Sequence, residues 1–390
     1  MSLVHPGVLR GAFGEVSRFR TELYACLTTR GDALFELCDA LLCTDGPVRT
    51  LVDLALAPEH RRGHGALYGG LNQGRIDVAR LRRAVAGLPL PRAADGRLVL
   101  AVDVSPWLRP DASTCPDRAF CHTYGRGEGK HQMVPGWPYS VVAALETGRT
   151  SWTAVLDAVR LEPGADVAAV TTAQIREVIE RLVAAGQWQP GDPKILVVLD
   201  AGYDAPRIEG TVIRLVVETL PSRGVNKPVW LWWSGTGATA NDVDRCWQSF
   251  LRGFDVEHTF RLFKQTLGWT KPRLRSPEAA DRWTWLVIAA YAQLRLARPL
   301  ATDLRRPWEK PAPPNKLTPA RVRRGFRNLR VKTGSPAGAP KPSRPGPGRP
   351  PGSKNHRPAT RHDVGRVLAT GEAHSRPTHH KVGTKPRRTG

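Results

Sequence analysis

The sequence has few cysteines and no long apolar run, and both absences narrow the class of protein. Six cysteines in 390 residues do not make a disulfide framework. The longest apolar stretch of the C-terminal half, around residues 283–290, is soon interrupted by Arg295 and Arg298, so it is too short to span a bilayer. The N-terminus lacks the basic-then-apolar layout of a signal peptide. We therefore expect a cytoplasmic protein with no membrane partner.

Paired CxxC motifs are also absent, which argues against a structural zinc site. Four possible ligands lie near one another in sequence, namely Cys115, Cys121, His122 and His131. Their spacing matches no compact zinc motif. Ordinary buried or loop positions are therefore the favoured interpretation of these residues.

Acidic residues are scarce, and the imbalance is concentrated at the C-terminus. The chain has 58 Lys and Arg against 35 Asp and Glu, a net charge of +23. Residues 301–390 contain 22 Lys and Arg against 4 Asp and Glu, which accounts for +18 of that total. A segment of this kind repels itself, stays extended and attracts phosphate, so it indicates a polyanionic partner. A merely solubilising or disordered terminus is the alternative.

Residues 1–95 predict a small helical domain, because apolar residues recur there at helical spacing. The segment Arg75–Leu88 has the pattern of a basic amphipathic helix, with Ile76, Val78, Leu81 and Val85 on its apolar side. Docking to DNA and simple packing within a bundle are equally compatible with this domain.

Residues 96–300 predict an α/β domain with a mixed sheet flanked by helices. The expected strands are residues 98–104, 138–145, 150–161 and 195–199, with a helix at 172–185. The run 195–199 is apolar throughout, which predicts a strand buried on both faces at the centre of the sheet. Two more strand-like runs at 211–219 and 229–233 precede long helices at 241–267 and 277–296.

The C-terminal part divides into two segments. Residues 301–330 form a basic extension with one short helix near 319–329, and residues 331–390 are a disordered tail rich in Pro and Gly. Within the tail, Pro347–Lys354 resembles an AT-hook, in which Arg349 would enter the narrow minor groove of A·T-rich DNA. A nonspecific phosphate-binding arm is the alternative.

Three acidic residues stand out because of their positions. Asp103 and Asp200 each follow an apolar run that predicts a strand, and Glu257 lies in a basic amphipathic helix. Open α/β sheets place ligands at the carboxyl ends of their strands, and carboxylate oxygens suit Mg²⁺ or Mn²⁺. If the two strands are neighbours, both aspartates reach one point. The alternative is that a strand-end Asp caps a turn, above all at Asp200.

The helix that carries Glu257 also carries two cations on the same face. Glu257, Arg261 and Lys264 are spaced i, i+4 and i+7, while Val256 and Phe260 lie on a neighbouring apolar face. A metal ligand beside phosphate-binding groups would have this pattern. An exposed helix with an i, i+4 salt bridge would have it as well, and the spacing alone does not separate the two.

The stretch around Glu257 resembles the C-terminal signature of bacterial insertion-sequence transposases of the DDE type. In that family a Glu is followed, after six intervening residues, by a Lys, as Glu257 is by Lys264. Phe250 occupies the usual Tyr position, and the expected Arg falls on Gly253, with Arg252 adjacent. The sequences VDVSPW around Asp103 and VLDAGYD around Asp200 resemble the family's first and second catalytic aspartates. The resemblance extends from about residue 15 to about residue 330.

This resemblance implies an RNase H-like catalytic core that cleaves double-stranded DNA at inverted-repeat ends and joins the freed 3′-hydroxyl to target DNA. Asp103, Asp200 and Glu257 would ligate two Mg²⁺ or Mn²⁺ ions. Lys264 would contact phosphate near the cut, with Arg252 and Arg261 as further DNA-binding residues. A homodimer in the DNA complex and a nucleoid-associated location are also implied.

One departure from the family pattern concerns the interval between the second and third acids. Asp200 and Glu257 are only 57 positions apart (257 − 200), whereas relatives with this signature have a sizeable β-rich insertion there. A reduced β-insertion at about 209–238 is therefore expected, in a shortened copy with impaired activity. Trp230 and Trp232 in this segment share one face and either stack on an unpaired base or, as the favoured alternative, pack against a neighbouring layer. A catalytically inactive, transposase-derived DNA-binding protein is the second functional hypothesis.

Overall fold

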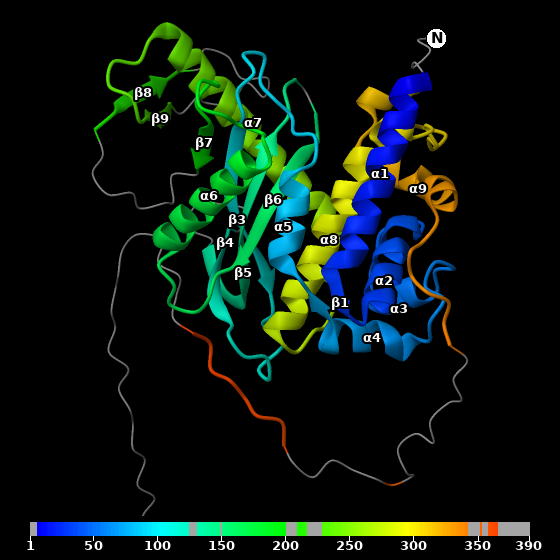
Figure 1. Cartoon of the computed structure of the whole chain (residues 1–390). Helices are drawn as coiled ribbons and strands as arrows, with labels where there is room; N and C mark the ends of the chain where they lie inside the picture. Colours follow the sequence, from blue (N-terminus) through cyan, green and yellow to red (C-terminus); the bar gives the residue numbers. More distant parts are fainter. Residues whose placement is uncertain are drawn as a thin grey trace, which may run out of the picture.

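The chain folds into a mixed sheet and a group of N-terminal helices, with one long helix between them (Figure 1). The computed structural model describes residues 6–124, 131–148, 150–199, 209–216, 228–341, 352 and 358–365. The central helix is α8 (Pro277–Ala297), which contacts α1, α2 and α4 on one side and strand β6 on the other. None of the described helices combines the length and the hydropathy needed to cross a bilayer.

The N-terminal region is helical, as the sequence predicts. Its elements are α1 (Pro6–Cys26), β1 (Leu27–Thr29), α2 (Gly31–Cys43), α3 (Leu51–Ala55), α4 (His64–Gln73), β2 (Arg75–Ile76) and α5 (Val78–Ala86). The predicted amphipathic helix begins at Val78 rather than Arg75, because Arg75 and Ile76 pair with β1 and Asp77 caps the helix by accepting a hydrogen bond from the backbone N–H of Arg80. Leu81 and Val85 are buried as expected.

The mixed sheet is built around a long antiparallel pair. Its elements are β3 (Val99–Leu108), β4 (Ala119–Tyr124), β5 (His131–Leu145), β6 (Thr153–Arg160) and β7 (Leu196–Leu199), with α6 (Val167–Ala184) before β7. Strand β5 pairs antiparallel with β3, β4 and β6, and β3 pairs parallel with β7. This order confirms the predicted mixed sheet flanked by helices and agrees with an RNase H-like fold.

Two sequence predictions about this sheet are wrong. Strand β4 lies in a segment for which no strand was predicted, and it pairs with an extension of β5 that begins at His131 rather than at residue 138. Strand β7 is half-buried instead of buried on both faces, and Leu199 is 45% exposed. The cause is position: among the described strands, β7 pairs only with β3 and therefore lies at the edge of the sheet.

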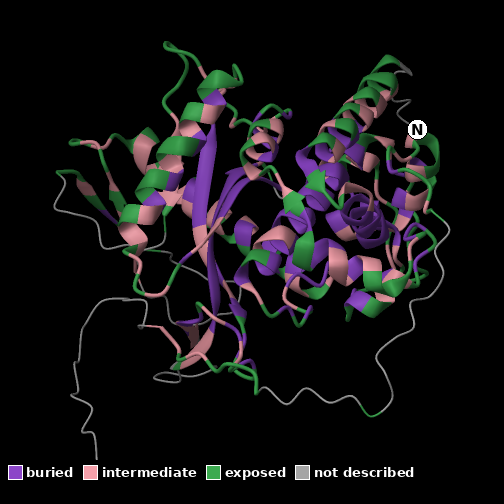
Figure 2. Cartoon of the chain, turned by 60° about the horizontal axis from the view of Figure 1, so that its bottom comes forward, coloured by how far each residue is buried: buried purple, intermediate pink, exposed green. Residues whose placement is uncertain are grey.

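Each face of the sheet packs against different helices, and the buried residues are concentrated along these contacts (Figure 2). Leu100 and Val102 of β3 pack with Val178 and Leu182 of α6. Their neighbour Ala101 belongs to the larger cluster, which includes the buried residues of α7 (Ala240–Gln265) and α8. Because side chains alternate along a strand, Asp103 lies on the same face as Ala101, toward α7.

The described part of the segment between β7 and α7 contains one hairpin. Strands β8 (Thr211–Leu215) and β9 (Val229–Trp233) pair antiparallel, and α7 follows directly, capped by Thr239. In Figure 1 this hairpin lies beside the sheet and away from the N-terminal helices. The described part of the expected β-insertion is therefore a two-stranded sheet.

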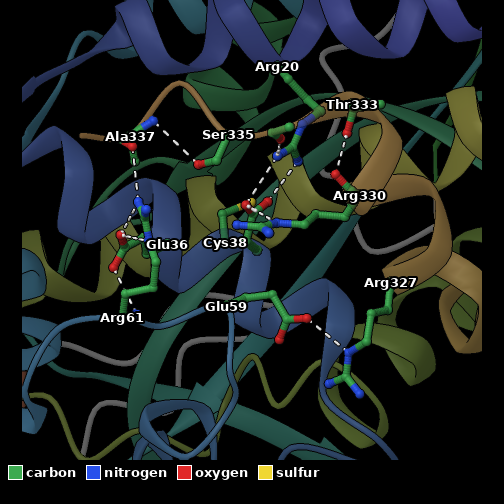
Figure 3. Close-up of polar contacts among 12 residues, drawn as sticks. Arg20, Glu36, Cys38, Glu59, Arg61, Arg327, Arg330, Thr333, Ser335 and Ala337 are labelled. Atoms are coloured by element: carbon green, nitrogen blue, oxygen red, sulfur yellow. Dashed lines mark hydrogen bonds and ion pairs between the residues drawn. The ribbon is translucent and has the colours of Figure 1, made fainter. Parts of the chain in front are cut away.

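The basic extension is a structural element, and four of its arginines are paired with acids of the chain. After the short turns η1 (Arg298–Leu300) and η2 (Pro314–Lys316), helix α9 (Pro319–Thr333) docks on α2 and α8. Four of its arginines form ion pairs with acidic residues outside the helix, and three of these pairs are Arg321 with Asp303 at 2.6 Å, Arg324 with Glu309 at 2.7 Å and Arg330 with Asp39 at 3.2 Å. Figure 3 shows the fourth pair, Arg327 with Glu59 at 2.9 Å. These cations hold the helix in place and are not exposed phosphate-binding groups.

Two described pieces of the C-terminal tail contact the folded chain. The carbonyl oxygen of Ala337 accepts a hydrogen bond from Arg61, and the backbone N–H of Gly338 donates to Asp32. Farther along, the N–H of His362 donates to the carbonyl oxygen of Ser113 at 2.9 Å. The tail therefore returns to the loop between β3 and β4.

Candidate active site

The first two acids of the predicted triad follow paired positions on adjacent strands. The parallel register of β3 and β7 matches Val102 with Leu199, the residues directly before Asp103 and Asp200. The two strands are therefore neighbours, which is the condition under which both aspartates reach one point. Asp103 lies in the middle of β3 and not at its end, because the strand continues to Leu108. Asp200 itself lies outside the described residues.

Helix α7 crosses the face of the sheet that carries Asp103. Its residues Val256, Phe260 and Phe263 are buried, and the helix contacts β3, β5, β6 and β7. A Cβ atom added at Gly253 would lie 3.9 Å from Cγ1 of Val198, so α7 passes β7 within ordinary contact distance at that point. Glu257, one turn farther along, is exposed.

Lys264 interacts electrostatically with both described acids of the triad. Burial lowers the pKa of Lys264, while the carboxylates of Glu257 and Asp103 act in the opposite direction. Both acids, which belong to α7 and β3, are therefore within electrostatic reach of one ammonium group. The thiol of Cys121 on β4 faces the same lysine, and burial raises its pKa to about 12, so it stays protonated.

The side chain of Lys264 contacts the ring of a buried tryptophan, Trp269. The ammonium nitrogen of Lys264 lies 5.9 Å from the ring centroid of Trp269, a cation–π geometry. Trp269 is held in turn by a hydrogen bond from its indole N–H to the hydroxyl of Thr284, at 2.8 Å. Neither Trp269 nor Cys121 was identified from the sequence. For Trp269, the only signal was its place five residues after the motif lysine.

The predicted DNA-binding arginines of α7 point in different directions. Arg261 is exposed and its Nε donates to the side-chain oxygen of Gln265 at 3.2 Å, so within the described chain the i, i+4 salt bridge with Glu257 is not formed. Arg252 donates to the carbonyl oxygen of Gly148 at 3.0 Å, in the turn between β5 and β6. Arg261 therefore stays near the acids, whereas Arg252 braces the helix against the sheet.

The two tryptophans of the hairpin are exposed, which contradicts the favoured prediction that they pack against a neighbouring layer. Trp230 is 61% exposed and Trp232 is 49% exposed. Trp230 pairs with Arg214 across the hairpin, and the guanidinium carbon lies 5.8 Å from its ring centroid. A two-stranded sheet offers no second layer for the outer face of β9. Arg349, the predicted minor-groove residue, lies outside the described residues, as does most of the AT-hook-like segment.

The residues at this site have the right chemistry for a hard divalent cation, although the described part is incomplete. Asp103 and Glu257 supply carboxylate oxygens, the donors that Mg²⁺ and Mn²⁺ prefer. One oxygen of Asp103 accepts a hydrogen bond from the N–H of Val104 at 2.7 Å, which orients the carboxylate. The described residues contain no cluster of three His, Cys, Asp or Glu side chains, and the third acid, Asp200, is not among them. Two of the three expected ligands thus lie around one lysine.

One family of known proteins matches the chain. A protein-family model described as a DDE superfamily endonuclease matches residues 22–223, slightly more than half of the chain. The matched range includes Asp103 and Asp200 and ends before Glu257 and Lys264. No curated protein matches the chain.

Proposed function

Because the chain belongs to the DDE superfamily of endonucleases, we propose that it is a transposase that cleaves DNA at insertion-sequence ends and joins them to target DNA. The observation that carries this proposal is the position of Lys264, within electrostatic reach of both Asp103 on β3 and Glu257 on α7. A phosphodiester held by this lysine would lie beside two carboxylates that come from separate elements.

Each residue has a distinct part in the proposed reaction. Asp103, Asp200 and Glu257 would hold two Mg²⁺ or Mn²⁺ ions, and such ions activate the attacking nucleophile and stabilise the leaving oxygen. Lys264 would bind a nonbridging phosphate oxygen next to the cut, which orients the phosphodiester and offsets its charge. Arg261 would contact phosphate farther along, and Trp230 and Trp232 would stack on an unpaired base.

Further parts of the proposal concern organisation and partners. We assign residues 1–95 to a helical domain, 96–300 to the catalytic domain and 301–330 to the docked extension, with 331–390 as a DNA-binding tail. The DNA substrates would be inverted-repeat ends and a target duplex, bound by a homodimer associated with the nucleoid.

A second candidate function, DNA binding without catalysis, is favoured by one observation. In the described sheet the outer edge of β7 has no neighbouring strand, and the described residues between β7 and α7 form a single hairpin, β8–β9. The interval of 57 residues between Asp200 and Glu257 leaves little room for a larger insertion (257 − 200). A shortened copy of this kind would keep its basic surfaces and lose cleavage activity.

Plasmid nicking separates the two functions. Purified full-length protein is incubated with supercoiled DNA and Mg²⁺ or Mn²⁺, alongside Asp103→Asn, Glu257→Gln and the control Glu278→Gln, an exposed acid in the first turn of α8. We expect nicking by the wild type and the control and none by the two active-site variants, while all four bind DNA. Binding by all four without nicking by any would refute catalysis and support the second function.

A further inference from the structure

The loop between α7 and α8 carries three exposed cations that have no part in the candidate active site. In residues 270–276 exposure alternates: Lys271, Arg273 and Arg275 are exposed, whereas Pro272 and Leu274 are buried. Within the part of the chain that the structure describes, none of these three cations forms a hydrogen bond or an ion pair through its side chain. This contrasts with α9, where four of the five arginines are paired with acids.

The loop is anchored from beneath by specific contacts. The carbonyl oxygen of Leu274 accepts hydrogen bonds from the guanidinium of Arg109 and, at 3.5 Å, from the thiol of Cys115. At its start, Gly268 has a φ of +68°, and a Cβ there would lie 2.7 Å from the carbonyl oxygen of Val48, so the turn requires glycine. The cations therefore project from a fixed backbone, which reduces the conformational entropy lost when they bind a ligand.

The sequence from the end of α7 to the start of α8 carries only positive charges. From His258 to Pro277 the sequence contains five Lys and Arg and no Asp or Glu. Two of the five, Arg261 and Lys264, lie near the acids of the candidate active site, and the other three are those of the loop. The loop also follows directly on Trp269, which supports Lys264, and it is tied to Arg109, the residue after the end of β3.

We propose that Lys271, Arg273 and Arg275 form a binding site for the phosphate backbone of a DNA strand that leads away from the active site. Three cations spread along a loop suit a row of phosphates, whereas a single phosphate group would require cations that converge on one point. Such contacts position a duplex without reading its sequence. The proposal rests on DNA being the substrate, as proposed above.

The salt dependence of DNA binding tests the site. A variant with Lys271→Gln, Arg273→Gln and Arg275→Gln is compared with a matched control that carries Lys310→Gln, Lys316→Gln and Lys332→Gln, three exposed lysines of the docked extension and α9. The affinity for a blunt-ended linear duplex of mixed sequence is measured over a salt series without divalent cations. Each lost phosphate contact should reduce the slope of log K against log salt by about 0.9, so roughly 2.7 for the loop variant and far less for the control. Equal changes in both variants would overturn the proposal.

Charge, folding and accessibility of the loop can be measured separately. Replacing Arg273 and Arg275 by Lys keeps the charge and should keep the slope of log K against log salt. Urea unfolding of the Gln variant should match that of the wild type, because all three side chains are exposed.

Bound DNA should protect Lys271, but not Lys310, from amine acylation. If the loop variant instead loses binding only to vesicles of anionic phospholipid, a membrane surface is the partner and the DNA site is refuted.

The salt-slope and nicking experiments can fail independently, so the loop site and the proposed nuclease function are tested separately. Wild-type nicking with an unchanged slope in the loop variant would remove the loop site and leave the nuclease. A reduced slope without nicking in the wild type would keep the loop site and remove catalysis.

Discussion

Lys264 experiences two opposing influences at the scale of a single residue. Burial disfavours its charged form and lowers its pKa, while the carboxylates of Glu257 and Asp103 favour the charged form. The two acids therefore partly offset the effect of burial on the pKa of Lys264. A phosphate brought to this position would act in the same direction as the acids.

The pKa of Lys264 should respond to the loss of its acidic neighbours. Replacing Asp103 by Asn removes an influence that raises the pKa, so the pKa of Lys264 falls further below its ordinary value. The pH midpoint for acylation of Lys264, followed by peptide mass spectrometry, should move to lower pH. Exposed Lys271 in the same samples is the control, and its midpoint should not move. An unchanged midpoint for Lys264 would contradict the proximity of the two residues.

At the scale of elements, α1, α2 and α9 are joined by a buried charge network. Arg20 of α1 and Asp39 of α2 form an ion pair at 2.7 Å and are 2% and 0% exposed, and Arg330 of α9 reaches the same carboxylate. Gln293 of α8 accepts another hydrogen bond from Arg20 at 2.7 Å. Four helices distant in sequence therefore meet at one pair of charges.

Removal of one partner should reveal how much this network contributes. Asp39→Ala leaves the Arg20 guanidinium buried without its counter-charge, and we expect the free energy of unfolding to fall by about 3–5 kcal/mol. The matched control is Glu15→Ala, which removes the exposed ion pair between Glu15 and Arg18 and should cost less than about 1 kcal/mol. Urea unfolding monitored by circular dichroism measures both. Similar losses in the two variants would mean that burial does not determine the contribution of this pair.

In the molecule as a whole, some cations form ion pairs that stabilise the fold and others are exposed at the surface. Four arginines of α9 are paired with Asp303, Glu309, Asp39 and Glu59, so these four cations are not free to bind a polyanion. The cations of the loop before α8 are exposed. Residues 366–390 alone contain six Lys and Arg and one Glu. The total of 58 Lys and Arg therefore overstates the cations that are accessible to DNA.

Truncation of the C-terminus tests whether its cations bind DNA or stabilise the fold. A chain that ends at Gly365 keeps the contact between His362 and Ser113 but loses the last basic residues. Its DNA affinity should depend less steeply on salt, with a slope smaller by up to about 5 if each cation of the net excess contacts a phosphate. A chain that ends at Thr333 also loses the carbonyl contacts to Arg61 and should be less stable to urea. A salt slope equal to that of the full chain would exclude a DNA role for residues 366–390.

The sequence by itself determined most of the elements, and it predicts the three acids. Its local apolar pattern located α7, α8, β6 and β9 to within a few residues, because each is a continuous run of apolar and aromatic residues or repeats them at helical spacing. The spacing from Glu257 to Lys264 identified the family signature, since that motif is local in the chain.

Only the tertiary structure decided the relations between distant segments. It placed β7 at the edge of the described sheet, exposed Trp230 and Trp232, and paired the arginines of α9 with acids from other parts of the chain. It also brought Trp269 and Cys121 to Lys264 and exposed the cations of the following loop. Burial and charge pairing depend on what packs against a residue, and a pattern in the sequence records only which residue types are present and how they are spaced.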